Sequence, residues 1–337
     1  MKKLITLALA AALVGPLGMA NAQAPSPIVI KFSHVVAADT AKGKAIEHFK
    51  KLAEEKTRGA VRVDVFHNST LYKDKEELEA LQMGAVQMLA PTPGKFGPLG
   101  VKEFEALDLP FLFDNFEEEL KITKGPIGQQ LLKKLETRGV QGLAFWNNGF
   151  KQLTSNKPIR KAEDFKGQKI RIVSSKVIEA QMRSVGALSQ VMAFGDLYTA
   201  LQTGVVDGQE NPTNVIYPTK LYEVQKYMTL SDHSYHGYAV VTNPKFWAGL
   251  PPNIRSALEA AMAETTDYFH AATIKENQDG LDAIRKSGKT QVITLTTEER
   301  NSWKRAMAKT HAEMAERVGK PFLQSIYKET NFDPTKL

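Results

Sequence analysis

"ALQTGVVDGQENP", at residues 200–212, decides the fold, because a close variant, "ALQMGAVQMLAP", stands earlier at residues 80–91. Five of the first seven residues are identical in the two copies. In each copy a run that suits a helix ends at a glycine, Gly84 or Gly204, and glycine is the usual residue just past a helix C-terminus. A valine-containing segment follows each glycine directly. We therefore predict one structural joint used twice, a helix that turns into a strand, in two α/β units.

The segments around both copies alternate between strand and helix patterns. The first series has strands at 28–32 and 61–65, a helix capped by Asp39 or Thr40, a helix at 74–83 and a strand at 86–90. The second has a strand at 169–173, a helix capped by Ser174 or Ser175, a strand-like pair at 191–192, a helix at 196–203 and a strand from 205. This alternation predicts an α/β fold with right-handed crossovers.

The last third of the chain is predicted to be mostly helical. Residues 251–287 suit a helix throughout, and at ~1.5 Å per residue such a helix is on the order of 50 Å long. Either it is broken or it runs along both units as a spine. Thr296 and Glu299 have the spacing of a capping box, which predicts a final helix to about Val318.

The N-terminus has the pattern of a secretory signal peptide. Met-Lys-Lys is followed by an apolar run at 4–14 and by the small residues Ala20-Asn21-Ala22. The apolar run is shorter than the ~20 residues that a membrane span requires. We expect residues 1–22 to be removed after Ala22 and the mature protein to be exported.

Composition excludes several classes of function. The 337-residue chain is 42% apolar and 24% charged, as soluble globular proteins are, and it has no cysteine, so disulfides and thiolate chemistry are excluded. Removal of Lys2 and Lys3 lowers the formal net charge from +7 to +5. The excess is spread along the chain, without a basic block interleaved with aromatic residues, so no nucleic-acid partner is expected.

Motifs for catalysis are mostly missing. The chain lacks the Walker, GxGxxG, GxSxG and HExxH patterns. Asp207 and Glu210 have the residue types of an acid/base pair, but no electrophile or nucleophile stands near them in the sequence. His233 and His236 have a spacing that suits a metal only on a helix, and we interpret them as structural histidines.

Cationic residues at strand and helix ends indicate an anion site instead. Arg171 lies between Ile170 and Ile172 in a strand, so its guanidinium needs either a ligand carboxylate or a nearby Asp or Glu. The other candidates follow predicted strands or open a helix, where α/β sheets bind ligands and helix N-termini attract anions. They are His34, Lys42, Lys44, Lys95 and Lys151.

Several phrases in order, among them "FWNNGFKQLTSNKPI", "GQKIRI" and "VMAFGDLYTALQTGVVDGQENP", resemble the solute receptors of TRAP (tripartite ATP-independent periplasmic) transporters. Within them the chain is most similar to the C4-dicarboxylate-binding, DctP type, over about residues 27–320. The resemblance implies a periplasmic binding protein of the two-domain, Venus-flytrap kind with a long spine helix. It divides the chain into a first domain, 25–148 plus 237–276, and a second, 149–236 plus 277–337.

The resemblance also assigns roles to residues. It implies that Arg171 clamps a carboxylate and that Asn211 and Phe194 line the cleft. Sialate-binding relatives have arginines where this chain has Lys95 and Lys151, which argues against sialate. Asn148 is expected to add a hydrogen bond to the carboxylate that Arg171 holds. The remaining cationic side chains suit a small second carboxylate of the ligand; they are Lys44, Lys95, Lys151 and His34.

The sequence thus predicts a monomeric periplasmic receptor without cofactor or catalytic residues, which delivers succinate, fumarate or malate to the TRAP membrane subunits. Three alternatives stay open. The ligand of such a receptor is another small acid, such as a 2-oxo or 2-hydroxy acid. The protein is a periplasmic enzyme that uses Asp207 and Glu210. Or it presents its ligand to a membrane-bound sensor kinase.

Overall fold

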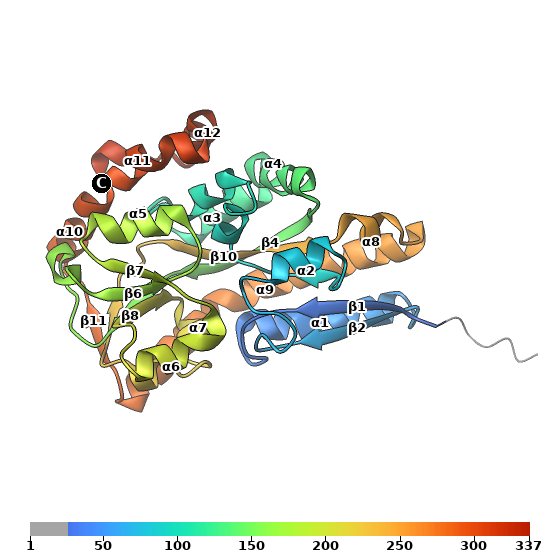
Figure 1. The fold of residues 1–337 in the computed structure, drawn as a ribbon, viewed down its shortest axis with the longest axis horizontal. Helices are drawn as coiled ribbons and strands as arrows, with labels where there is room; N and C mark the ends of the chain where they lie inside the picture. The colour runs from blue at the N-terminus through green and yellow to red at the C-terminus, as the bar shows by residue number, and fades with distance from the viewer. Residues whose placement is uncertain (1–25) are drawn as a thin grey trace, which may run out of the picture.

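The computed structural model describes residues 26–337, and their strands form two mixed sheets that lie side by side with helices around them (Figure 1). The predicted α/β fold is therefore confirmed. The predicted signal peptide and its cut after Ala22 lie outside the described residues. We call each sheet with the helices that pack on it a lobe.

The first sheet has the order β2-β1-β3-β10-β4. Strand β1 pairs in parallel with β2 and β3, and β10 runs antiparallel to β3 and β4. Its strands are β1 (Ile28–Ser33), β2 (Val61–Phe66), β3 (Met88–Leu89), β4 (Gln141–Phe150) and β10 (Tyr235–Thr242).

The second sheet has the order β11-β9-β5-β8-β6-β7. Strand β6 pairs in parallel with β7 and β8, and β5 runs antiparallel to β8 and β9. Its strands are β5 (Gln152–Ser155), β6 (Lys169–Ile172), β7 (Leu188–Val191), β8 (Gly208–Asn211), β9 (Tyr227–Leu230) and β11 (Gln291–Thr294).

The repeated phrase builds the same joint in both lobes. Helices α2 (Glu77–Gln82) and α6 (Leu197–Gln202) each end before a glycine with a left-handed φ, +77° at Gly84 and +75° at Gly204. Each following strand, β3 or β8, lies between a parallel and an antiparallel neighbour. The prediction is confirmed, although both strands begin two or three residues later than expected, because the turn after each glycine takes up the intervening residues.

Within residues 26–337, three segments join the two sheets. Strand β4 continues through Lys151 into β5, β9 continues through residues 231–234 into β10, and the Lys151 N–H donates to the Ser234 carbonyl at 2.9 Å. The third is α9 (Pro252–Ser287), an unbroken helix of 36 residues that runs along both lobes (Figure 1). Gly280 lets it approach the second lobe closely, since a Cβ there would lie 2.7 Å from the Thr213 carbonyl oxygen. The spine interpretation of this segment is therefore correct.

The remaining helices cover the sheets. They are α1 (Ala41–Lys56), α3 (Phe116–Lys124), α4 (Pro126–Lys134), α5 (Lys176–Ser184), α7 (Thr213–Ile216) and α8 (Pro244–Ala248). Short 3-10 helices are η1 (Pro93–Phe96), η2 (Lys102–Asp108), η3 (Leu135–Arg138), η4 (Ala162–Phe165), η5 (Phe194–Asp196), η6 (Leu221–Val224) and η7 (Pro334–Lys336). None of the helices within residues 26–337 combines the length and apolar character that crossing a membrane requires.

The C-terminal helices differ from the prediction. The capping box is present, with the Thr296 Oγ1 accepting from the Glu299 N–H at 3.2 Å, but the single helix predicted to about Val318 is divided into α10 (Thr297–Met307) and α11 (Lys309–Val318). A further helix, α12 (Lys320–Thr330), follows. Phe322 and Ile326 of α12 join the apolar core that also contains Leu107. The predicted assignment of residues 277–337 to the second domain does not account for this packing onto the first lobe.

Candidate ligand-binding site

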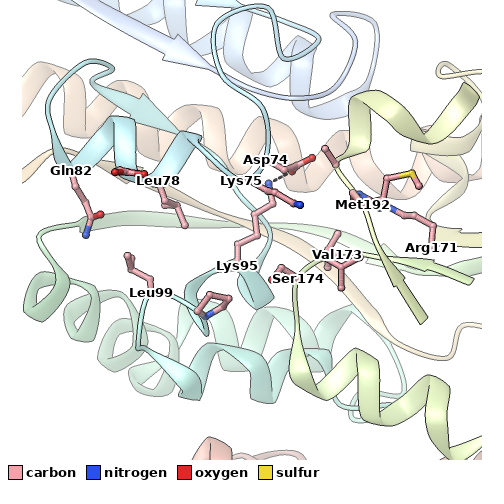
Figure 2. Close-up of a pocket in the computed structure, with 14 residues that line it drawn as sticks. Asp74, Lys75, Leu78, Gln82, Lys95, Leu99, Arg171, Val173, Ser174 and Met192 are labelled. Atoms are coloured by element: carbon pink, nitrogen blue, oxygen red, sulfur yellow. Dashed lines mark hydrogen bonds and ion pairs between the residues drawn. The ribbon is translucent and has the colours of Figure 1, made fainter. Parts of the chain in front are cut away.

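Three adjoining cavities lie between the lobes, and Arg171 at the end of β6 borders all of them. Two inner cavities have volumes of about 10 and 30 Å³, and both are also bordered by Asn211 and His236. The outer cavity, about 370 Å³, lies between α2 and the ends of β6 and β7; half of its lining residues are polar or charged, but its surface is mostly apolar (Figure 2). The polar side chains that suit an organic acid converge on the inner pair, although the outer space is larger.

Arg171 is buried and has no carboxylate partner within the described part of the chain. Its Nε and Nη2 donate to the Met192 carbonyl at 3.0 and 2.7 Å, which uses two of its five N–H donors. Among residues 26–337 no carboxylate oxygen lies within 4.0 Å of the guanidinium. Arg171 thus forms no direct ion pair with an Asp or Glu among these residues, although the charges of Asp74 and Glu210 act on it from farther away, and three donors are left for an anion.

Asn211 and Phe194 lie beside this guanidinium. Strand β8 pairs with β6, which brings Asn211, only 4% exposed, next to Arg171. The Asn211 amide donates to Gln209 and retains a second N–H and its carbonyl oxygen. The Phe194 ring centroid lies 5.7 Å from the Arg171 Cζ. The structure thus brings together the three residues that the family resemblance implies.

Lys151 lies in the inner site, but its charge is already balanced. Its Nζ is 2.6 Å from Glu210, and the other Glu210 oxygen is 2.9 Å from His233 Nε2. Burial by itself raises the pKa of Glu210, yet Lys151 and His233 together hold that pKa down to about 2. Asp207, by contrast, accepts from the Lys169 N–H at 2.8 Å and supports a turn. Glu210 and Asp207 are thus occupied by structural contacts.

Lys95 extends from the first lobe to Asp74 and borders the outer cavity together with Arg171 (Figure 2). It forms ion pairs with Asp74 and, at 2.6 Å, with Glu77. Burial lowers the pKa of Lys95, but the two carboxylates outweigh that effect and raise it. Lys95 therefore stays charged, in a cluster with one more carboxylate than cation.

Lys44 does not lie in the site, contrary to the prediction. Its side chain is 46% exposed and its Nζ is 3.1 Å from Glu276. Lys42, two residues earlier, is buried, donates to the Ala90 carbonyl at 3.1 Å and lies over the Tyr238 ring. Residues two apart on a helix point to different faces, and only Lys42 shares the spacing of the inward-facing Ile46. This four-residue spacing from Ile46 is the sequence signal that could have identified Lys42, rather than Lys44, as the inward-facing lysine.

His34 and Asn148 also differ from their predicted roles. Burial, with Lys42 and His67 nearby, lowers the pKa of His34 to about 2, so the ring is neutral and cannot balance a carboxylate. It lies 2.7 Å from His67. The Asn148 amide is used in two reciprocal hydrogen bonds with Asn214, at 3.0 and 2.8 Å. Both residues support the lobes rather than the inner cavities.

Two residues of the inner site were not identified from the sequence as ligand contacts. His236 on β10 borders both inner cavities, and burial holds its pKa well below the ordinary value. Asp108, at the end of η2, borders one of them. Asp108 stands in no distinctive motif, and the spacing of His236 from His233 does not indicate a ligand contact; both residues reach the cleft only through the tertiary fold. Within residues 26–337 no group of three or more His, Cys, Asp or Glu side chains is placed to hold a metal.

Two α/β lobes around a buried arginine that has no carboxylate partner among residues 26–337 fit a solute-binding protein, and comparison with known proteins shows that class. Residues 32–318 match the family "Bacterial extracellular solute-binding protein, family 7" (DctP). The chain is 54% identical to the C4-dicarboxylate-binding periplasmic protein DctP of Rhodobacter capsulatus, covering 90% of this chain and 91% of that protein. The chain belongs to this family.

Solved structures show the same fold. A TRAP periplasmic solute-binding protein from Shewanella oneidensis with bound succinate has a TM-score of 0.88 at 36% identity, covering 90% of this chain and 99% of that one. A TRAP periplasmic solute-binding protein from Pseudomonas aeruginosa with bound L-malate has a TM-score of 0.82 at 39% identity, covering 85% and 100%. The similarity extends over almost all of both relatives.

Proposed function

We propose that this protein is the periplasmic receptor of a TRAP transporter and binds C4-dicarboxylates such as succinate, fumarate and malate. The observation that carries the proposal is the buried guanidinium of Arg171, which has three free donors and no carboxylate partner within residues 26–337. The names of the relatives support the choice of acid, since one is a C4-dicarboxylate-binding protein and two hold succinate or L-malate.

In the proposed complex Arg171 holds one carboxylate by two parallel hydrogen bonds, and Asn211 donates to it. The second carboxylate faces Lys42 and Lys95, which border the same inner cavity as Arg171. Because the site is shielded from water, each charge interaction is stronger than at the surface. The acid contacts both lobes at once, so it stabilises the closed arrangement.

The setting of this activity follows from the N-terminal sequence and the family. We propose that the signal peptide is cut near Ala22, that the mature monomer works in the periplasm, and that its closed form docks on the TRAP membrane subunits. A catalytic role is disfavoured by the contacts of Asp207 and Glu210, which hold a turn and an ion pair. The division into domains at about residues 148 and 236 remains our proposal.

Titration calorimetry tests the ligand. The protein is first unfolded and refolded to remove acids carried over from the cell, and then titrated with succinate, fumarate and malate. We expect heat of binding and a rise in melting temperature with at least one of them. Absence of both signals with all three contradicts the proposal.

A second candidate is a receptor for a larger organic acid with one carboxylate. The outer cavity favours it, because this space of about 370 Å³ adjoins Arg171 and has a mostly apolar surface. Two relatives hold dicarboxylates, succinate or L-malate, so we place this candidate second. Native mass spectrometry of protein purified without refolding distinguishes the candidates by the mass of the bound acid.

A further inference from the structure

Asp108 is a buried carboxylate that has no evident structural task for one of its oxygens. It is the last residue of η2, is 3% exposed, and borders an inner cavity together with Arg171 and Asn211. Within residues 26–337, its Oδ2 has no hydrogen-bond partner. Burying a charged oxygen without a partner is strongly unfavourable, so this atom calls for either a proton or a ligand.

The groups around Asp108 come from both lobes. Glu105 lies on the same 3-10 helix, Glu210 on β8 and Lys151 between β4 and β5 act on its charge, and Ser175 at the start of α5 lies nearby. Arg171 and the neutral His236 line the same cavity, next to Tyr235. Gly94 leaves the space for this arrangement, since a Cβ there would lie 2.5 Å from the Asp108 Oδ2.

The charge balance of the cleft favours a proton, rather than a cationic partner, on Asp108. The buried cations of the cleft are Lys42, Lys95, Lys151 and Arg171, and its carboxylates are the buried Glu77, Asp108 and Glu210 and the partly buried Asp74. Glu105 is balanced separately by Arg317, which donates to both of its oxygens. The four cations therefore meet four carboxylates before any ligand enters. A dicarboxylate adds two more negative charges, which favours the uptake of a proton by a carboxylate of the site.

Asp108 is the carboxylate best placed to take up that proton. Burial raises its pKa to about 7, with Glu105 and Glu210 adding to the rise and Lys151 and Ser175 opposing it. Near neutral pH the protonated form is therefore accessible. A ligand carboxylate beside it raises the pKa further, because like charges disfavour ionisation.

We propose that Asp108 contacts the ligand: it takes up a proton from solvent when a dicarboxylate binds, and its O–H donates a hydrogen bond to a ligand carboxylate. The proposal rests on the proposed function of the cleft. It assigns the binding of one proton per ligand to a residue that the sequence did not single out. Affinity for succinate then falls as the pH rises through 7, approaching about tenfold per pH unit.

The test compares the wild-type protein with Asp108→Asn by titration calorimetry with succinate. Asparagine has the same shape, is neutral and keeps an N–H donor. Titration at pH 8 in two buffers of different ionisation heat measures the protons taken up on binding. We expect the variant to bind at pH 6 within about threefold of the wild type, to lose affinity less steeply above pH 7, and to take up about one proton fewer. Asp282→Asn, at an exposed position on α9, is the matched control and is expected to change none of these values.

Proton uptake by Lys42 must be distinguished from proton uptake by Asp108 in the same titrations. Burial lowers the pKa of Lys42 to about 7, against the opposing effect of Glu77, so a bound dianion also makes Lys42 take up a proton. Proton uptake that is equal in wild type and Asp108→Asn overturns the proposal and points to Lys42 or to Glu77, whose pKa is also raised by burial. Succinate binding without any proton uptake overturns it as well. Failure of the wild type to bind at any pH contradicts the proposed function instead.

Infrared difference spectroscopy gives a readout that does not depend on a variant that folds. Wild-type protein labelled with ¹³C in the aspartate side-chain carboxyl is measured with and without succinate at pH 8. We expect a shifted band of a protonated carboxyl to appear on binding. The label separates the protein's carboxyl groups from those of the ligand, so a spectrum without such a band overturns the proposal.

Discussion

The carboxylate of Asp74 accepts a hydrogen bond from the backbone N–H of Phe194 at 2.5 Å, although the two residues belong to different lobes. The other oxygen of Asp74 pairs with Lys95. Burial raises the pKa of Asp74, but Lys95 and Arg171 lower it below the ordinary value, so the carboxylate is ionised near neutral pH. The contact therefore ties the lobes together directly beside the arginine.

We expect Asp74→Ala to favour the open arrangement of the lobes and to weaken succinate binding by about tenfold, because a charge-assisted hydrogen bond across the cleft is lost. Titration calorimetry measures the affinity, and small-angle X-ray scattering measures the radius of gyration of the free protein. Lys73→Met is the matched control: its ion pair with Asp196 also bridges the lobes, but both side chains are more than half exposed, and such pairs contribute little. Equal effects of the two substitutions contradict the role of Asp74.

Substitution of Arg171 is expected to abolish binding. Arg171→Ala removes the clamp, and Arg171→Lys keeps the charge but not the planar fork, so we expect losses of at least about 100-fold and about tenfold. Calorimetry gives the affinities, and circular dichroism checks folding. Arg62→Ala, at an exposed site paired with Asp64, is expected to bind normally. Micromolar affinity retained in Arg171→Ala refutes the assignment.

Lys42 and Lys44 form a matched pair on the first turn of α1. We expect Lys42→Met to weaken succinate binding by about tenfold or more, because a buried cation near the second carboxylate is removed. Lys44→Met removes an exposed pair with Glu276 and is expected to leave the affinity unchanged. If calorimetry shows that Lys44→Met weakens binding and Lys42→Met does not, the sequence prediction that Lys44 contacts the ligand is correct instead.

Ionised Glu210 is expected to stabilise the folded protein, so the free energy of unfolding should fall as the pH is lowered. Its pKa in the folded state, about 2, lies below the ordinary 4.5, so its stabilising effect is present above pH 4.5 and is lost as the pH falls toward 2. Between pH 5 and pH 3 this corresponds to about 2 kcal/mol of unfolding free energy. Urea denaturation of wild type and Glu210→Gln across this range measures it. The loss on acidification is expected to be smaller in the variant, and parallel curves contradict the prediction.

The two joint glycines are expected to behave alike. Gly84→Ala and Gly204→Ala each place a side chain at a left-handed φ, which costs about 1–2 kcal/mol, while no atom lies within 3.4 Å of either new Cβ. Urea denaturation is expected to give similar losses for both. Gly195→Ala, where φ is not left-handed and the nearest atom is 3.6 Å away, is the control and should cost less. A clear difference between the two joints indicates that they are not equivalent.

Much of the fold follows from local sequence. The repeated helix–glycine–strand phrase, the capping residues Thr40 and Ser175, and the continuous helical pattern of α9 depend on neighbours within a few turns, and the structure agrees with them. The burial of Arg171 was predictable for the same reason, since Ile170 and Ile172 flank it in a strand. The helix break at Ala308 and the packing of α12 on the first lobe were not, because they depend on the core of distant elements.

The sequence by itself determined the α/β class, the repeated joint and the arginine that needs an anion, because backbone propensity and periodicity are local properties. The tertiary structure alone decided which cations are available to a ligand. Lys95 is held by Asp74 and Glu77, Lys151 is held by Glu210, His34 is neutral, and Lys42 takes the place expected of Lys44. Charge balance in a buried cleft depends on contacts between side chains from segments far apart in the chain, and a short sequence pattern does not determine those contacts.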